Sequence, residues 1–124
     1  MSVESDIVSL LSASQMLQGL VSGRIYLGQA PEKTSLPHVV FYNVSGVLAH
    51  SHDGLSDLRD RRIDVLCIAE THAVARQMAD AVIAALDAKT ATNIGRILAT
   101  AEDVDYEIND GIWVGTVTCR VFVK

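Results

Sequence analysis

Cysteine, clustered basic residues and long apolar runs are all scarce in this sequence of 124 residues. Its two cysteines, Cys67 and Cys119, do not form a Cys-x-x-Cys pair, which excludes a zinc knuckle and a dithiol redox motif. Because each stands alone within an apolar run, we predict that both are small buried hydrophobic residues. The formal net charge of −5 argues against a surface that grips duplex nucleic acid, since such a surface needs clustered lysine and arginine. The densest basic cluster is Arg59, Arg61 and Arg62.

Membrane and secretion signals are missing as well. No window approaches eighteen consecutive apolar residues, so no membrane-spanning helix is predicted. The N-terminal stretch MSVESDIVSLL starts with acidic residues and lacks the basic segment of a secretory signal, so we expect a protein made and kept in a cytoplasm. The length and the hydrophobic fraction of 49% predict a single globular domain, residues 1–124, that buries one core.

The sequence also lacks catalytic motifs. It contains no Gly-x-Ser-x-Gly elbow, no Cys-plus-His motif and no Gly-x-x-x-x-Gly-Lys phosphate loop. Asp103 and Asp105 do share one face of a predicted strand, as a metal-dependent nuclease would require. Alternating acids are, however, the usual way to solvate the outer side of a surface strand, and we prefer that interpretation. We therefore predict no catalytic residues, no metal site, no cofactor and no enzyme.

Two segments have the spacing of amphipathic helices. Apolar residues from Val3 to Val21 recur mostly every three or four positions, which predicts one helix or a pair of helices broken near Ser12 and Ser14. The segment from Val74 to Leu86 repeats more regularly, and Thr71 is its predicted N-cap. Both helices should form by burying their apolar stripes on a sheet.

The remaining segments have the period of two that is typical of strands. The predicted strands are a short one at 24–26, then His38–Ser45, Arg61–Ala69, Gly95–Ala99 and a C-terminal hairpin starting at Asp103. Gly115, inside the last strand, predicts a bulge or the close approach of another element. The fold class is therefore α+β, with two helices packed on a largely antiparallel β-sheet that ends in a β-hairpin, as a single pair of layers.

The segment Gly46–Asp60 (GVLAHSHDGLSDLRD) separates two predicted strands and is predicted to be a long loop. Such loops are usually functional or disordered. His50, His52 and Asp53 could ligate a divalent metal, but a catalytic metal site needs three rigidly held ligands and a second shell. These three residues lie in a predicted loop, and the only candidates for a fourth partner are His38 and His72. A contact element is the preferred interpretation, and a loop without function is the alternative. The predicted contact residues are Leu48, His50, His52, Asp53, Leu55, Leu58, Arg59 and Asp60.

The order and spacing of these segments resemble a known family over nearly the whole chain. The most specific features are G-R-I-Y, A-P and L-P-x-V-V-F-Y in succession from Gly23 to Tyr42, and the passage DVLCIAET from Asp64 into the helix. In these features the chain resembles the small tail completion or tail terminator proteins, which join head to tail in long-tailed bacteriophages and prophages.

This resemblance implies a structural protein that forms a ring, with six subunits as the expected number, at the head-proximal end of the tail tube. Its implied partners are further copies of itself, the tail tube protein and the head connector protein, with DNA passing through without specific binding and with no membrane. The implied location is the virion tail, and the host cytoplasm during assembly. On this reading Asp103, Asp105 and Glu107 would face the central channel, so that DNA slides without sticking.

Three alternative functions remain. The protein could be another component of the head–tail connector. It could be a small-molecule-binding α+β regulatory domain, or a metal-dependent nuclease that combines the histidine cluster with the acids.

Overall fold

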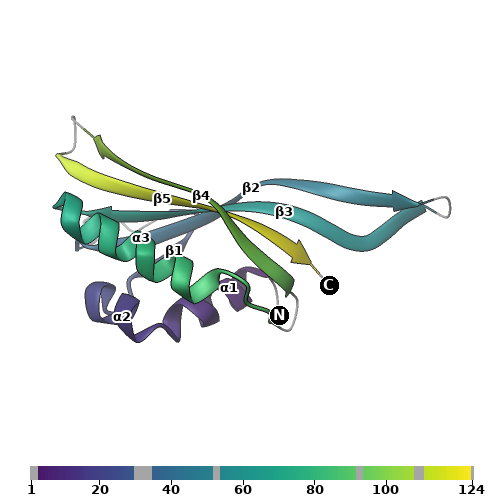
Figure 1. Cartoon of the computed structure of the whole chain (residues 1–124), viewed down its shortest axis with the longest axis horizontal. Coiled ribbons are helices and arrows are strands. Elements are labelled where there is room, and N and C mark those ends of the chain that lie inside the picture. The colour runs from purple at the N-terminus through teal and green to yellow at the C-terminus, as the bar shows by residue number, and fades with distance from the viewer. Residues whose placement is uncertain (1–2, 30–34, 52–53, 92–93, 108–110, 124) are drawn as a thin grey trace.

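The computed structural model describes residues 3–29, 35–51, 54–91, 94–107 and 111–123. Its elements are α1 (Val3–Ser12), α2 (Gln15–Val21), β1 (Ile25–Leu27), β2 (His38–Ser51), β3 (Gly54–Ala69), α3 (His72–Leu86), β4 (Ile94–Glu107) and β5 (Ile112–Val123). The strands form one sheet in the order β1-β2-β3-β5-β4 (Figure 1). β1 runs parallel to β2, and the other neighbours pair antiparallel. The α+β prediction is confirmed, and the N-terminal stripe is a pair of helices.

Short polar side chains set the helix boundaries. The Ser14 side chain accepts a hydrogen bond from the Leu17 N–H and so caps α2. Thr71 does the same for Val74 at the start of α3, as predicted. None of the helices in the described residues is long and apolar enough to span a membrane.

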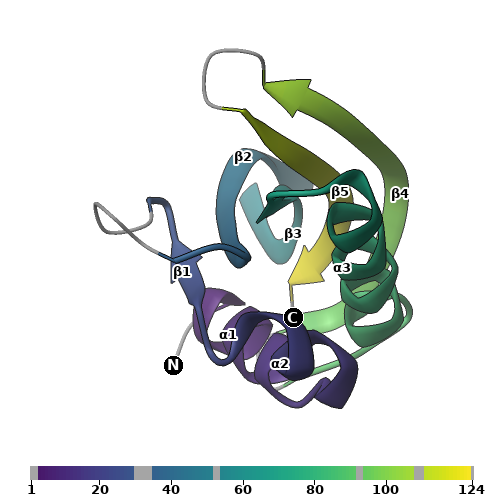
Figure 2. The same cartoon turned by 90° about the vertical axis from the view of Figure 1, so that its left-hand side faces the viewer.

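One face of the sheet packs against the three helices, and we call the other face the helix-free face (Figure 2). Alternate residues of β3 and β5 face the helices and are buried. The largest fully buried side chains come from the helices and from the strands β2, β3 and β4: Ile7, Leu11, Leu17, Phe41, Ile63, Met78, Leu86, Ile94 and Ile97. Burying each of these contributes roughly 1.5–3 kcal/mol, which exceeds what such short helices could gain from propensity.

The C-terminal half of the sheet differs from the prediction in one respect. The segments predicted as a strand at 95–99 and as the first strand of the hairpin are a single strand, β4, with irregular register near Ile94 and near Ala99. Such irregularities bend a long strand without ending it, which explains why the sequence pattern breaks there.

Gly115 marks a close approach and no bulge, because its pairing is regular with both neighbouring strands. A Cβ atom added at this glycine would lie 3.1 Å from the Ala75 carbonyl oxygen and 3.6 Å from the Ala79 Cβ. The helix α3 therefore rests directly on the backbone of β5.

Candidate assembly surfaces

The predicted loop Gly46–Asp60 is a strand hairpin, so the loop prediction was wrong. β2 continues to Ser51 and β3 begins at Gly54, and Leu48 pairs with Arg59 while His50 pairs with Leu55. β3 pairs with β5 only from Arg59 onward, so the hairpin projects beyond the rest of the sheet (Figure 1). We call residues 47–58 the arm. Two strands can pair through backbone hydrogen bonds without burying an apolar face. The arm therefore lacks the alternation of apolar and polar residues that predicts a strand, and its polar sequence is typical of a loop.

The predicted contact residues are divided between the two strands of the arm and its base. Leu48 and His50 lie on β2, and Leu55, Leu58, Arg59 and Asp60 lie on β3. His52 and Asp53 lie outside the described residues. The backbone thus places the described members of this set along one projecting ribbon.

The histidines do not converge within one chain. His38 precedes His50 by twelve residues on the same strand, a separation of roughly 40 Å at about 3.3 Å per residue. His72 starts α3 shortly after β3 ends at Ala69, which is the end of β3 away from the arm. Within the described residues no three His, Cys, Asp or Glu side chains are placed to hold a metal ion.

The acids predicted to line a channel lie at the outer end of the sheet. Asp103 pairs with Thr116 and Asp105 with Val114, which places both exposed carboxylates on the helix-free face. Glu107 ends the same strand, opposite Ile112. The acids therefore line the open edge of β4.

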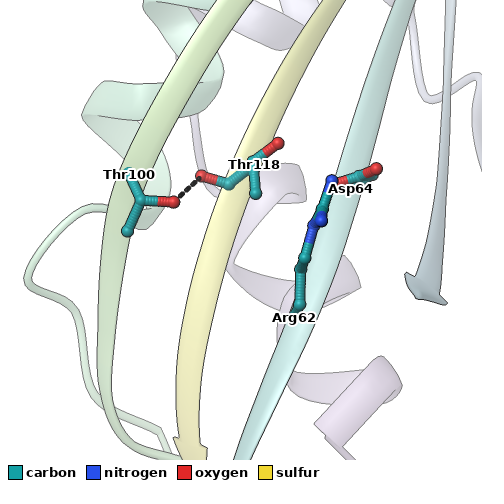
Figure 3. A network of polar contacts seen from close by, with 4 residues as sticks. All are labelled: Arg62, Asp64, Thr100 and Thr118. Carbon is teal, nitrogen blue, oxygen red and sulfur yellow. Dashed lines mark hydrogen bonds and ion pairs between the residues drawn. The ribbon is translucent and has the colours of Figure 1, made fainter. Parts of the chain in front are cut away.

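The helix-free face carries charges of both signs. Arg62 Nε lies 3.4 Å from Asp64 Oδ1, and the Thr100 hydroxyl donates to the Thr118 carbonyl oxygen at 3.2 Å (Figure 3). Arg120 is exposed on the same face and lies over the Phe122 ring, with 5.2 Å from its guanidinium carbon to the ring centroid. The acidic character is thus local to the β4 end of this face.

The sheet edge at β4 is covered along only half of its length. The segment after α3 pairs with it, because the Ala88 N–H donates to the Ile97 carbonyl oxygen and the Ile97 N–H donates to that of Lys89. The Asp87 carboxylate accepts a hydrogen bond from the Ala99 N–H at 3.0 Å. Among the described residues, no backbone hydrogen bond reaches this edge beyond Ala99 from outside the sheet. Residues 101–107 of β4 are consequently an open edge.

An aromatic cluster near this open edge was not predicted from the sequence. The ring of Trp113 lies 5.0 Å from the rings of both His72 and Tyr106, and Tyr106 is 43% exposed. Tyr106 and Trp113 are opposite each other in the β4–β5 hairpin, so hairpin pairing could have revealed them as a pair. The position of His72 follows only from the packing of α3.

The pKa values of His38 and of both cysteines are shifted. Burial lowers the pKa of His38, the Ser35 carbonyl near its Nδ1 opposes this shift, and the charge of Arg24 adds to it. Burial raises the pKa of both Cys67 and Cys119 to about 12, with weaker contributions from nearby negative charges. The prediction that both cysteines are buried is confirmed, and these thiols are held in their unreactive neutral form.

One surface hollow is a poor small-molecule site. It has a volume of about 350 Å³ and lies between the α1–α2 junction and α3, where alanines and Met16 form most of its walls. Ser14 and Lys89 are its polar members. A specific ligand site usually adds several convergent polar groups, so this hollow gives the small-molecule alternative little support.

Comparison with known proteins adds a family and a fold. A family model described as tail completion protein gp17 matches residues 5–124. The structure is similar to a chain from a solved structure described as the virion of a native gene transfer agent (GTA) particle. The TM-score is 0.79 and the identity 18%, over 98% of this chain and 94% of that chain, so this likeness concerns the fold alone. A comparison with curated proteins found no match.

Proposed function

The chain belongs to the tail completion protein gp17 family, and on that premise we propose that it forms a ring of six subunits at the head-proximal end of the tail tube. The family gives it a structural role in the phage tail. In our proposal the ring ends polymerisation of the tube and joins the tail to the head connector protein, without catalysis. The observation that carries the proposal is the family match over residues 5–124.

The sheet supports a ring because its two edge strands, β1 and β4, are different and run in opposite directions. β1 and β2 run parallel to each other, and β4 runs opposite to both. A rotation about an axis along the strands keeps every strand direction, so the β4 edge of one subunit meets the opposite edge of the next subunit in antiparallel orientation. Antiparallel pairing is the more stable form, and a contact between two different edges closes into a ring when the rotation allows it.

The arm supports a further contact in this proposal. It projects from the sheet, no other described strand pairs with either of its edges, and its sequence carries three leucines among polar residues. In our proposal the arm reaches a neighbouring subunit or the tail tube protein. Leu48, Leu55 and Leu58 would then be the apolar contacts of this interface, with its charged residues at the rim.

The acids on β4 have a proposed role toward DNA. In a ring whose helix-free face lines the channel, Asp103 and Asp105 would repel phosphate groups and keep DNA from adhering. The assembling protein would be found in the host cytoplasm and the finished ring in the virion tail.

Light scattering across a concentration range, with negative-stain images of the largest species and of tails released from capsids, tests the ring. Rings with a central hole, or a ring at the head-proximal end of each tail, are expected. A monomer at every concentration, together with tails that carry no copy of the protein, would refute the proposal. A ring located on the connector and not on the tail would favour another connector component.

Shortening the arm tests its contact separately. Deleting Ala49–Leu58 and joining Leu48 to Arg59 through Asn-Gly keeps an existing strand pair and supplies a two-residue turn. The shortened protein should unfold at a temperature close to that of the full chain yet fail to complete tails. Normal tail completion by this variant would refute the contact role of the arm but not the proposed ring.

A further inference from the structure

The two edge strands of the sheet lie at the same level. Among the described residues, no other strand pairs with the outer side of β1. Two backbone groups on that side take part only in local turns, because the Ile25 N–H donates to the Gly23 carbonyl oxygen at 2.9 Å and the Leu27 carbonyl oxygen accepts from the Gln29 N–H at 3.0 Å. Following the paired residues across the sheet, Ile25 of β1 lies on one row with Val39, Cys67, Gly115 and finally Val104 of β4. The next two rows likewise join Tyr26 to Asp103 and Leu27 to Glu102 at the opposite edges of the sheet. β1 therefore lies level with the part of β4 that the segment after α3 leaves uncovered.

From this alignment we infer that β1 of one subunit adds to residues 101–107 of β4 in the next subunit, with Ile25 opposite Val104. This inference rests on the proposed ring and names its contact. A rotation that does not move the subunit along the strands brings these rows together directly. The covered half of β4 explains why the added strand pairs at this level and not further along.

The side chains at this register are complementary. Extending the row sequence by one residue places Arg24, which directly precedes β1, opposite Asp105, and the alternation of side chains puts both residues on the helix-free side. The Arg24 Nε donates to the Pro37 carbonyl oxygen at 2.9 Å, which holds this side chain beside the edge of its own sheet. The Arg24 carbonyl oxygen accepts a hydrogen bond from the Val39 N–H, so Arg24 continues the line of β1 along β2. Opposite charges facing each other across antiparallel strands stabilise the pair. The acids that line β4 would thus select a strand that carries an arginine.

Exposed apolar side chains at the edges agree with this contact. Two large hydrophobic side chains that are exposed lie on the edge strands, Leu27 on β1 and Tyr106 on β4. Leu27 is 54% exposed and Tyr106 43% exposed. Both lie beside the backbone groups that the contact would pair, so the contact would remove apolar surface from water at both edges.

A cross-link tests the register. The double variant Tyr26→Cys/Asp103→Cys places two thiols on adjacent strands of neighbouring subunits, within the Cα separation of about 4.4–6.8 Å that a disulfide requires. Within one subunit the two positions are four strands apart, and the native cysteines are buried. Mild oxidation of rings or completed tails should give a ladder of linked subunits on a non-reducing gel. Its longest member would report the ring size.

The matched control moves one cysteine inward by a single strand. Thr116 pairs with Asp103 and lies on the same face, so Tyr26→Cys/Thr116→Cys would place the thiols about two strand spacings, roughly 10 Å, apart. This variant should give no ladder. If the Tyr26→Cys/Asp103→Cys variant forms rings or tails normally but gives no cross-links, the inferred contact is overturned and the ring is not. Absence of rings for the wild-type protein would refute the ring itself.

Exchanging the charges of Arg24 and Asp105 tests the same contact if the cysteine variant does not assemble. Arg24→Glu and Asp105→Arg should each weaken association by roughly two- to fivefold per interface, measured by light scattering at low salt. The double variant should recover most of the loss. Single variants that associate as the wild type does, or a double variant no better than either single one, would contradict the pairing of Arg24 with Asp105.

Discussion

The contact between Gly115 and α3 predicts that the same substitution has opposite effects at two glycines. Gly115→Ala adds a Cβ at 3.1 Å from the Ala75 carbonyl oxygen, which belongs to a helix backbone and cannot swing aside. Overpacking of this kind costs about 1–3 kcal/mol, and the reduced entropy of the unfolded chain offsets about 0.5–1 kcal/mol of it. The free energy of unfolding should therefore fall by roughly 1–2 kcal/mol. For a domain of this length that lowers Tm by roughly 3–10 °C.

Gly19 provides the matched control because it lies inside α2, is exposed, and has no atom within 4 Å of an added Cβ. Gly19→Ala should raise the free energy of unfolding by about 0.5–1 kcal/mol through helix propensity. Urea denaturation followed by circular dichroism measures both variants under identical conditions. If Gly115→Ala proves as stable as the wild type while Gly19→Ala gains stability, then α3 does not rest on the β5 backbone as described.

Three further predictions concern titration and charge. The pKa of His38 is lowered in the folded protein, so the unfolded chain takes up a proton as pH falls through about 6.5 while the folded chain does not, and the free energy of unfolding falls below that pH. His38→Gln should reduce this loss, measured by denaturation at pH 7.5 and pH 5. Equal pH dependence of the variant and the wild type would contradict the prediction. Cys67 and Cys119, with pKa values raised to about 12, should react with a thiol reagent at pH 8 only in denaturant, and rapid labelling of the native protein would disprove their burial. Reversing Asp103 and Asp105 to lysine should slow DNA ejection, because the reversed side chains attract phosphate, and an unchanged ejection rate would refute the channel role of these acids.

The helices, the Thr71 cap and the buried cysteines could be predicted because their signals are local, whereas Ser14 was predicted only as a break between two helices. Ser14 and Thr71 cap the residues three positions further on, and the apolar stripe of α3 is complete within fifteen residues. The single strand β4 was divided in the prediction, since the irregular pairing near Ala99 interrupts the alternation of apolar and polar residues.

The arm could not be predicted as strand because its pattern lacks a buried face. The backbone hydrogen bonds of the arm form between β2 and β3. This pairing depends on the register that is set where the two strands join the core. The described residues chosen for the predicted contact therefore lie on paired strands, in a segment whose sequence is typical of a polar loop.

Sequence alone determined the fold class, the absence of known catalytic motifs and the resemblance to tail completion proteins, because these depend on composition, periodicity and the order of segments. Only the tertiary structure decided which part of the β4 edge is uncovered. The segment after α3 covers half of β4 through hydrogen bonds between residues that are up to twelve positions apart, and β1 lies level with the other half through pairing across five strands. Such alignment is set by the register of a whole sheet, and no local pattern in the chain encodes it.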